Sequence, residues 1–205
     1  MTGRPSKPVL LALHYQNEVL HRDGRIRVGV AEGDGGRDTL VLSAQRLLAG
    51  ARARAWPIIH VRIAFRPDYA DCPLNMPIFR RVVELDAVKE GEWGSAFLDA
   101  LAPIASAREF VVTHTRISAF AGTPLEQTLR MLDAQQLLVA GVATHSVVEG
   151  TVRDAADRGF DVYVAADACA AASPQTHEAA LASMALVAEI TTVDAAFTWM
   201  EGSAA

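Results

Sequence analysis

Six short runs of aliphatic residues recur along the chain, and they limit its fold more than any other feature of the sequence. Most of them are apolar at consecutive positions, whereas a strand with one solvent-exposed face would alternate apolar and polar residues. Continuous apolar runs predict strands buried on both faces, and therefore a parallel sheet covered by helices. The predicted strands are Val9–His14, Pro57–Ile63, Phe110–Thr113, Leu137–Ala140, Asp161–Ala165 and Glu189–Val193.

Helical patterns lie between these runs, at Asp38–Ala53, Leu125–Leu132, His145–Gly159 and Pro174–Ala188. In the third of them, Ser146 and Glu149 have the spacing of a capping box. Alternating strands and helices are typical of βαβ crossovers. We therefore predict an α/β fold with three layers (α/β/α), a six-stranded, mostly parallel sheet and a Rossmann-like architecture. A length of 205 residues fits one domain over residues 1–205.

Two long segments, Glu18–Arg37 and Ala64–Pro77, lack such periodicity and are rich in glycine and proline respectively. Long loops in a compact domain usually serve as lids or as contacts with a partner. We expect one of these two uses for both segments.

Charge and composition exclude several classes of function. A net charge of -5 argues against a nucleic-acid partner, which needs clustered positive charge. The longest apolar runs fall far short of the roughly 20 residues of a membrane-spanning helix. Residues Met1–Pro8 lack the apolar core of a signal peptide, and the chain holds only two cysteines, which predicts a cytoplasmic location. We expect a small-molecule substrate or ligand, no cofactor, no membrane and no nucleic acid.

Four segments, in this order, resemble the isochorismatase-like hydrolases, also called cysteine hydrolases. They are Leu10–Asn17, Arg116–Leu125, Gly141–Val148 and Asp167–Ala170. The resemblance implies a six-stranded parallel sheet and a homo-oligomer, either a dimer or a tetramer, whose subunits help to close the pocket. It also implies an aspartate after the first strand, a lysine after the third, and a nucleophilic cysteine on the helix after the fourth.

This sequence departs from that pattern at all three positions, which hold His14, His114 and Val147. Valine has no lone pair, so it cannot form an acyl-enzyme. Its neighbour Ser146 is rotated by about 100° on a helix, and the sequence favours a helix N-cap over a nucleophile there. The two cysteines, Cys72 and Cys169, are interpreted as structural thiols, with Cys72 left open as a group that reaches the pocket from a lid.

We predict that His14 and His114 are the catalytic pair. A single histidine at the end of an apolar strand would more simply be a core residue, but here two fall on positions that line the active site in the resembling proteins. Neutral imidazoles accept and donate protons near neutral pH. A pair in contact titrates as a unit, with one pKa lowered by the charge of the other.

Further candidates surround this pair. Ala143 and Thr144 resemble the cis-peptide turn whose N–H groups hold an oxyanion, and Val147 is expected to form the floor of the pocket. Gln16, Phe120 and His145 are predicted to contact substrate. Alternatives stay open for all three: Gln16 also suits a role in shaping the turn, Phe120 equally suits the core, and His145 suits a surface or subunit contact. His60 is interpreted as a buried structural imidazole. Converging histidines would suit zinc, but no short-spaced metal motif occurs, and we expect no metal.

Two functions remain open from the sequence. The first is a hydrolase that uses His14 and His114 as general base and acid without a covalent intermediate, on an amide, an ester or an acid-labile enol ether. The second is a catalytically inactive pseudo-hydrolase that binds a ligand or serves as a subunit of an assembly. The distance between the two imidazoles in the folded protein bears directly on this choice.

Overall fold

The computed structural model describes residues 7–26 and 36–202. Six strands form one sheet in the order β3-β2-β1-β4-β5-β6, and every pair of neighbours is parallel. The strands are β1 (Pro8–Leu13), β2 (Ile58–Ile63), β3 (Glu109–His114), β4 (Gln136–Val142), β5 (Asp161–Ala170) and β6 (Glu189–Thr191). The predicted six-stranded parallel α/β fold is confirmed.

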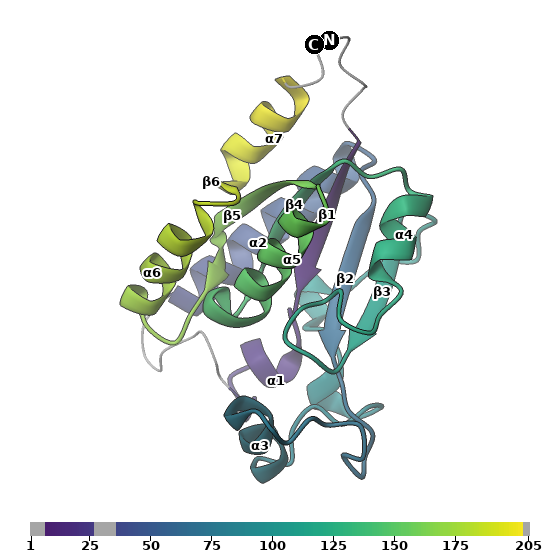
Figure 1. Ribbon diagram of the computed structural model, residues 1–205, viewed down its shortest axis with the longest axis vertical. Helices are drawn as coiled ribbons and strands as arrows, with labels where there is room; N and C mark the ends of the chain where they lie inside the picture. The colour runs from purple at the N-terminus through teal and green to yellow at the C-terminus, as the bar shows by residue number, and fades with distance from the viewer. Residues whose placement is uncertain (1–6, 27–35, 203–205) are drawn as a thin grey trace.

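Helices cover both faces of the sheet (Figure 1). On one face α2 packs against α7 and β5, and on the other α5 packs against α6 and β5. The α-helices are α1 (Asn17–Leu20), α2 (Gly36–Ala53), α3 (Pro77–Glu84), α4 (Leu125–Met131), α5 (Glu149–Asp157), α6 (Pro174–Met184) and α7 (Val193–Gly202). None of the described helices is both long and apolar enough to span a membrane.

The core explains why the strands are apolar at consecutive positions. All seven residues of β4 are buried, as are five of the six in β1. Both strands lie in the middle of the sheet, so helices cover each of their faces and neither face tolerates polar side chains. β3 is an edge strand, and its Val111 is exposed on the outer side.

Three details differ from the sequence prediction. The segment after β4 is not an α-helix from His145: residues Thr144–Val148 form a π-helical turn (η3), and α5 begins only at Glu149. Ser146 lies inside that turn and caps neither segment, so the predicted capping box is wrong. β5 continues five residues past Ala165, with a register shift opposite β4. Short polar spacings do not distinguish a wide helical turn from a regular one.

The predicted loop Ala64–Pro77 has no regular element before α3 begins at Pro77. Part of the other predicted loop, Glu18–Arg37, lies outside the described residues, as does most of Met1–Pro8. Figure 1 shows α1 and α3 beyond the arrowheads of β1 and β2, at the carboxyl ends of the strands. These two short helices, together with η3, surround the end of the sheet where a ligand would bind.

Candidate active site

The candidate site lies where the strand order reverses. The chain proceeds outward from β1 through β2 to β3 and then returns to place β4 on the other side of β1. In open parallel sheets, the crevice at such a switch point, outside the carboxyl ends of the strands, is where ligands bind. His14 follows β1 and Ala143 follows β4, so the sequence puts both at this crevice.

His14 has an unusual backbone conformation, with φ at 57°. This left-handed region is disfavoured for most side chains, although histidine enters it more readily than branched residues do. The N–H of His14 donates to the carbonyl of Val61 at 2.9 Å. The chain therefore turns sharply at the end of β1 while it stays hydrogen-bonded to β2, and this turn aims the imidazole across the strand ends.

Gly141 makes room for that turn. It has φ at 151°, and a Cβ atom built on it would lie 2.2 Å from the carbonyl oxygen of Leu13. Any side chain at this position would push β4 away from the residue that precedes His14. Glycine therefore lets the two central strands approach closely beside the site.

The structure brings His14 and His114 together. Their Nε2 atoms lie 2.5 Å apart, and the ring centroids are 4.8 Å apart. His114 ends β3, which is separated from β1 by β2, so its side chain reaches across the end of β2. Both residues are buried, with exposed fractions of 8% and 2%.

The hydrogen-bond partners assign a proton to each ring. Nδ1 of His114 lies 3.3 Å from the carbonyl oxygen of Ser118, which can only accept, so this nitrogen carries the proton. The Nε2 atom of neutral His114 is then an acceptor, and Nε2 of His14 donates to it. His14 thus retains an unprotonated Nδ1, which receives no hydrogen bond from the described part of the chain.

Burial keeps both rings neutral. Desolvation, followed by the charge that His114 would carry, holds the pKa of His14 well below its usual value. Desolvation also lowers the pKa of His114 to about 4, although its bond to Ser118 acts in the opposite direction. Near pH 7 the pair therefore holds no charge, and one N–H joins the two rings.

A small cavity of about 60 Å³ opens beside His14. Its wall is mostly apolar and includes Ile63, Phe79, Val82, Ile117, Val142 and Val147. The polar contributors are His14, Ser146 and Arg116. Val147, which was predicted to form the floor of the pocket, is one of the residues that line the cavity. The expectation that Ser146 faces elsewhere is wrong, because in the π-helical turn both it and its neighbour Val147 border the same cavity.

The turn after β4 contributes backbone to the cavity. The peptide bond between Val142 and Ala143 is cis, and both residues line the wall. Thr144 is fully buried and does not line it; its hydroxyl lies 2.9 Å from Nδ1 of His177 on α6. His145 is exposed on the outer side of the turn and is not among the lining residues.

Two predicted substrate contacts also lie outside the cavity wall. Gln16 is completely buried, and its amide donates to the carbonyls of Ile63 and Ser95 and accepts from the N–H of Ile63. It thereby ties the end of β1 to β2, the shaping role that the sequence left open. Phe120 is buried against Phe160, with the guanidinium of Arg158 4.7 Å from its ring centre.

Sequence reasoning missed the helix α3, which supplies Ile78, Phe79 and Val82 to the wall. A signal was present: Pro77 suits a first helical position, and the apolar residues that follow it recur at helical spacing. The prolines of the preceding segment, Ala64–Pro77, led to the prediction of a loop that ends at Pro77, and the helix that begins there was not predicted.

None of the remaining candidates is among the residues that line the cavity. His60 is buried in β2, with Nε2 2.8 Å from Oε2 of Glu109. Cys169 is buried beside β4, and burial raises the pKa of its thiol to about 12. Cys72 is also buried, and burial raises its pKa. Within residues 7–26 and 36–202, no group of three or more histidine, cysteine or acidic side chains is arranged to hold a metal ion.

Comparison with known proteins gives consistent matches along nearly the whole chain. The model of the isochorismatase domain matches residues 8–195. A ureidoacrylate amidohydrolase of Methylobacterium radiotolerans is 29% identical over 88% of this chain and 74% of its own length. An uncharacterised isochorismatase family protein of Escherichia coli, YecD, is 32% identical over 68% of this chain and 71% of its own.

Solved structures show the same likeness. The crystal structure of an isochorismatase family protein from Desulfovibrio vulgaris superimposes with a TM-score of 0.82 and 30% identity. That superposition covers 93% of this chain and 96% of the other. The likeness therefore extends over the sheet, its flanking helices and the strand ends that carry the candidate site.

Proposed function

Because this chain belongs to the isochorismatase family, we propose that it is a hydrolase in which His14 and His114 perform general acid/base chemistry on a small molecule without a covalent intermediate. One observation carries the proposal: the two imidazoles share a hydrogen bond, and His14 lines a cavity that the inert side chain of Val147 also borders. A proton carrier is present there, and a thiol is not among the lining residues.

The hydrolytic step follows from the tautomers. The unprotonated Nδ1 of His14 takes a proton from water, and the oxygen of that water attacks the carbonyl carbon of the substrate. The imidazolium then returns the proton to the leaving nitrogen or oxygen as its bond to carbon breaks. Burial makes the cationic ring a strong acid, which slows the first transfer and favours the second.

We assign the negative charge of the intermediate to the backbone at residues 143–147. This turn is the amino-terminal end of the helical segment that continues into α5, and such ends favour negative charge. Fixed N–H donors need no reorganisation as the charge forms. Ala143 borders the cavity and is well placed for this role.

The cavity restricts the substrate. A volume of about 60 Å³ is far below the roughly 300–1,000 Å³ of ordinary ligand pockets. Binding therefore requires either a very small molecule or an outward movement of α3, which forms part of the wall. The apolar wall favours a compact substrate, and the presence of Arg116 among the lining residues favours one with an anionic group. An amide is the first bond to test, because a relative bears the name of an amidohydrolase.

The test is turnover of a panel of small amides, esters and enol ethers by the purified protein and by His14→Ala and His114→Ala variants. We expect each substitution to lower kcat by about 10²–10⁴-fold. The matched control is Ser146→Ala, which borders the same cavity and should retain activity if water is the nucleophile. Loss of activity in that control would point to an acyl-serine route instead.

A parent protein that binds panel members without turning any of them over would contradict the proposal. It would favour the pseudo-hydrolase that the sequence left open, in which the fold and cavity serve ligand binding or assembly. The expected dimer or tetramer and the cytoplasmic location stay predictions, and light scattering of the purified protein tests the first of them.

A further inference from the structure

Ser118 connects the histidine pair to the neighbouring helix through two different atoms. Its carbonyl oxygen lies 3.3 Å from Nδ1 of His114, and its hydroxyl donates to Oδ2 of Asp154 at 2.6 Å. The same hydroxyl accepts the N–H of Phe120 at 3.2 Å. Ser118 lies in the loop after β3, whereas Asp154 is on α5, so the bond joins the loop to a rigid element.

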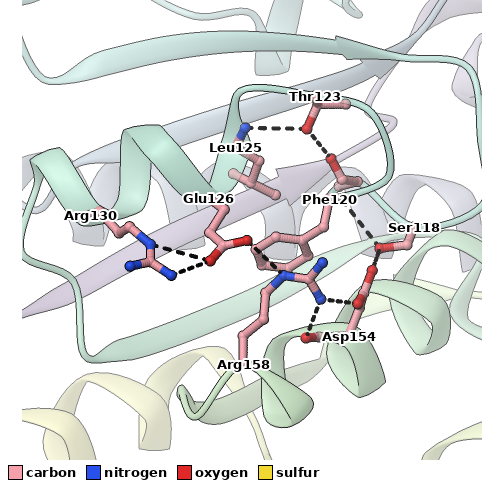
Figure 2. A network of polar contacts seen from close by, with 9 residues as sticks. Ser118, Phe120, Thr123, Leu125, Glu126, Arg130, Asp154 and Arg158 are labelled. Atoms are coloured by element: carbon pink, nitrogen blue, oxygen red, sulfur yellow. Dashed lines mark hydrogen bonds and ion pairs between the residues drawn. The ribbon is translucent and has the colours of Figure 1, made fainter.

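Asp154 is in turn held by a chain of ion pairs, which Figure 2 shows in full. Arg158, the residue just after the end of α5, donates to Oδ1 of Asp154 and also to Glu126 on α4 at 3.1 Å. Glu126 receives a second cation, Arg130, from its own helix. Networks with several partners restrict a carboxylate far more than a single exposed ion pair does.

A second set of contacts seats the same loop on α5. The N–H of Ala119 donates to the hydroxyl of Thr151 at 3.1 Å, and Thr151 is fully buried. A Cβ atom at Gly150 would lie 2.8 Å from the side chain of Ile117. The loop therefore lies directly on the helix surface, with the Ser118–Asp154 bond at its centre.

We propose that Ser118 and Asp154 are positioning residues that set the tautomer of His114, and through it keep Nδ1 of His14 free of a proton and open to the cavity. If the Ser118 carbonyl moves away, Nδ1 of His114 loses its acceptor, and the proton is free to sit on Nε2 instead. That Nε2–H then donates to His14, whose own proton must move to Nδ1.

This rearrangement would remove the proposed general base without changing any residue that touches the cavity. The inference rests on the proposed function for its catalytic consequence. The tautomers themselves are measured without substrate, so the hydrolase proposal and the positioning proposal can fail separately. Absence of turnover would contradict the hydrolase proposal but not the tautomer result. An unexpected tautomer would contradict the positioning proposal but not a requirement of His14 and His114 for activity.

The experiment records long-range proton–nitrogen NMR correlations of the imidazoles near neutral pH, in the whole 205-residue chain. In the parent protein we expect the proton on Nδ1 of His114 and on Nε2 of His14. In Ser118→Ala and Asp154→Ala, the shifts of both rings should move toward the opposite tautomers, by roughly a tenfold change in their ratio, as expected for the loss of one well-placed hydrogen bond.

Two further variants separate positioning from general stability. Asp154→Asn keeps an oxygen acceptor for the Ser118 hydroxyl and should restore the parental shifts. Glu126→Gln weakens the outer ion pairs but keeps the Ser118–Asp154 bond, so it should shift the tautomers far less than Asp154→Ala does. Once a substrate is known, Asp154→Ala should lower kcat with little effect on KM, because it contacts nothing in the cavity.

Two results would overturn the inference. One is an unprotonated Nδ1 of His114 in the parent protein, a result that the parent spectrum gives without any variant. The other is a folded Ser118→Ala or Asp154→Ala variant whose imidazole shifts match those of the parent. If Asp154→Ala does not fold, the spectra of Ser118→Ala and of the parent protein still test the inference.

Discussion

Nε2 of His60 in β2 lies 2.8 Å from Oε2 of Glu109 in the neighbouring strand β3, and neither residue lines the cavity. Glu109 also accepts from Arg52 at 2.8 Å and from the N–H of Ile104 at 3.0 Å. Its side chain is only 3% exposed. The carboxylate thus joins β3 to β2 and α2 inside the protein.

We predict that Glu109→Ala lowers the free energy of unfolding by about 3–5 kcal/mol, because it leaves buried partners of a carboxylate without compensation. Urea denaturation measures the change. The matched control is Glu126→Ala, which removes only surface ion pairs and should cost much less than Glu109→Ala, because exposed ion pairs contribute little to stability. Equal losses in the two variants would show that Glu109 acts as an ordinary surface charge.

Stability should fall as the pH falls from about 6.5 to about 4. Burial lowers the pKa of His14 and of His114, the latter to about 4. Between about pH 6.5 and pH 4, the unfolded chain therefore binds protons at these histidines that the folded chain does not bind. The stabilisation is complete above the unfolded pKa and is lost as the pH drops through the folded one. His114 alone accounts for about 3 kcal/mol at 1.36 kcal/mol per pKa unit.

The measurement is the free energy of unfolding at several pH values for the parent and for His114→Gln. The substitution should make the profile shallower between about pH 4 and 6.5, because His114 no longer contributes to it. A parental slope in His114→Gln would mean that its imidazole is not held neutral by burial.

The left-handed backbone of His14 separates two substitutions at one position. His14→Asn should fold with nearly parental stability, since asparagine tolerates φ near 57°. His14→Val should lose an additional 1–3 kcal/mol or so, because a branched side chain strains that conformation. Thermal unfolding compares the pair, and both should lack activity. Equal stabilities would argue against strain at this residue.

Gly141→Ala should destabilise the protein by about 2–4 kcal/mol, because the new methyl group meets the carbonyl of Leu13 at 2.2 Å. Gly159→Ala is the matched control: this glycine also has a positive φ but has no atom within 4 Å of a built Cβ. It should cost only about 1–2 kcal/mol, from backbone conformation alone. Chemical denaturation ranks the two, and NMR signals of His14 should shift only in Gly141→Ala.

The sequence predicted the sheet well because the relevant information is local. A strand such as β4 is apolar at every position wherever it is placed in a doubly covered sheet, so its pattern alone indicates two buried faces. The start of α5 was harder to predict, because Ser146 and Glu149 have the sequence spacing of a capping box although they do not form one. The actual turn is π-helical, and only the packing of η3 against β4 and α6 shows it.

For the site, the sequence by itself determined which side chains are available at the strand ends: imidazoles at 14 and 114 and an isopropyl group at 147. Tertiary structure alone decided that the two Nε2 atoms meet, that Gln16, Phe120 and His145 lie outside the cavity wall, and that Ser118 fixes a proton on His114. The physical reason is the difference between local and long-range determinants of structure. Side-chain chemistry is a property of each residue, whereas a contact between residues 100 positions apart depends on strand order, register and the backbone turn at each strand end.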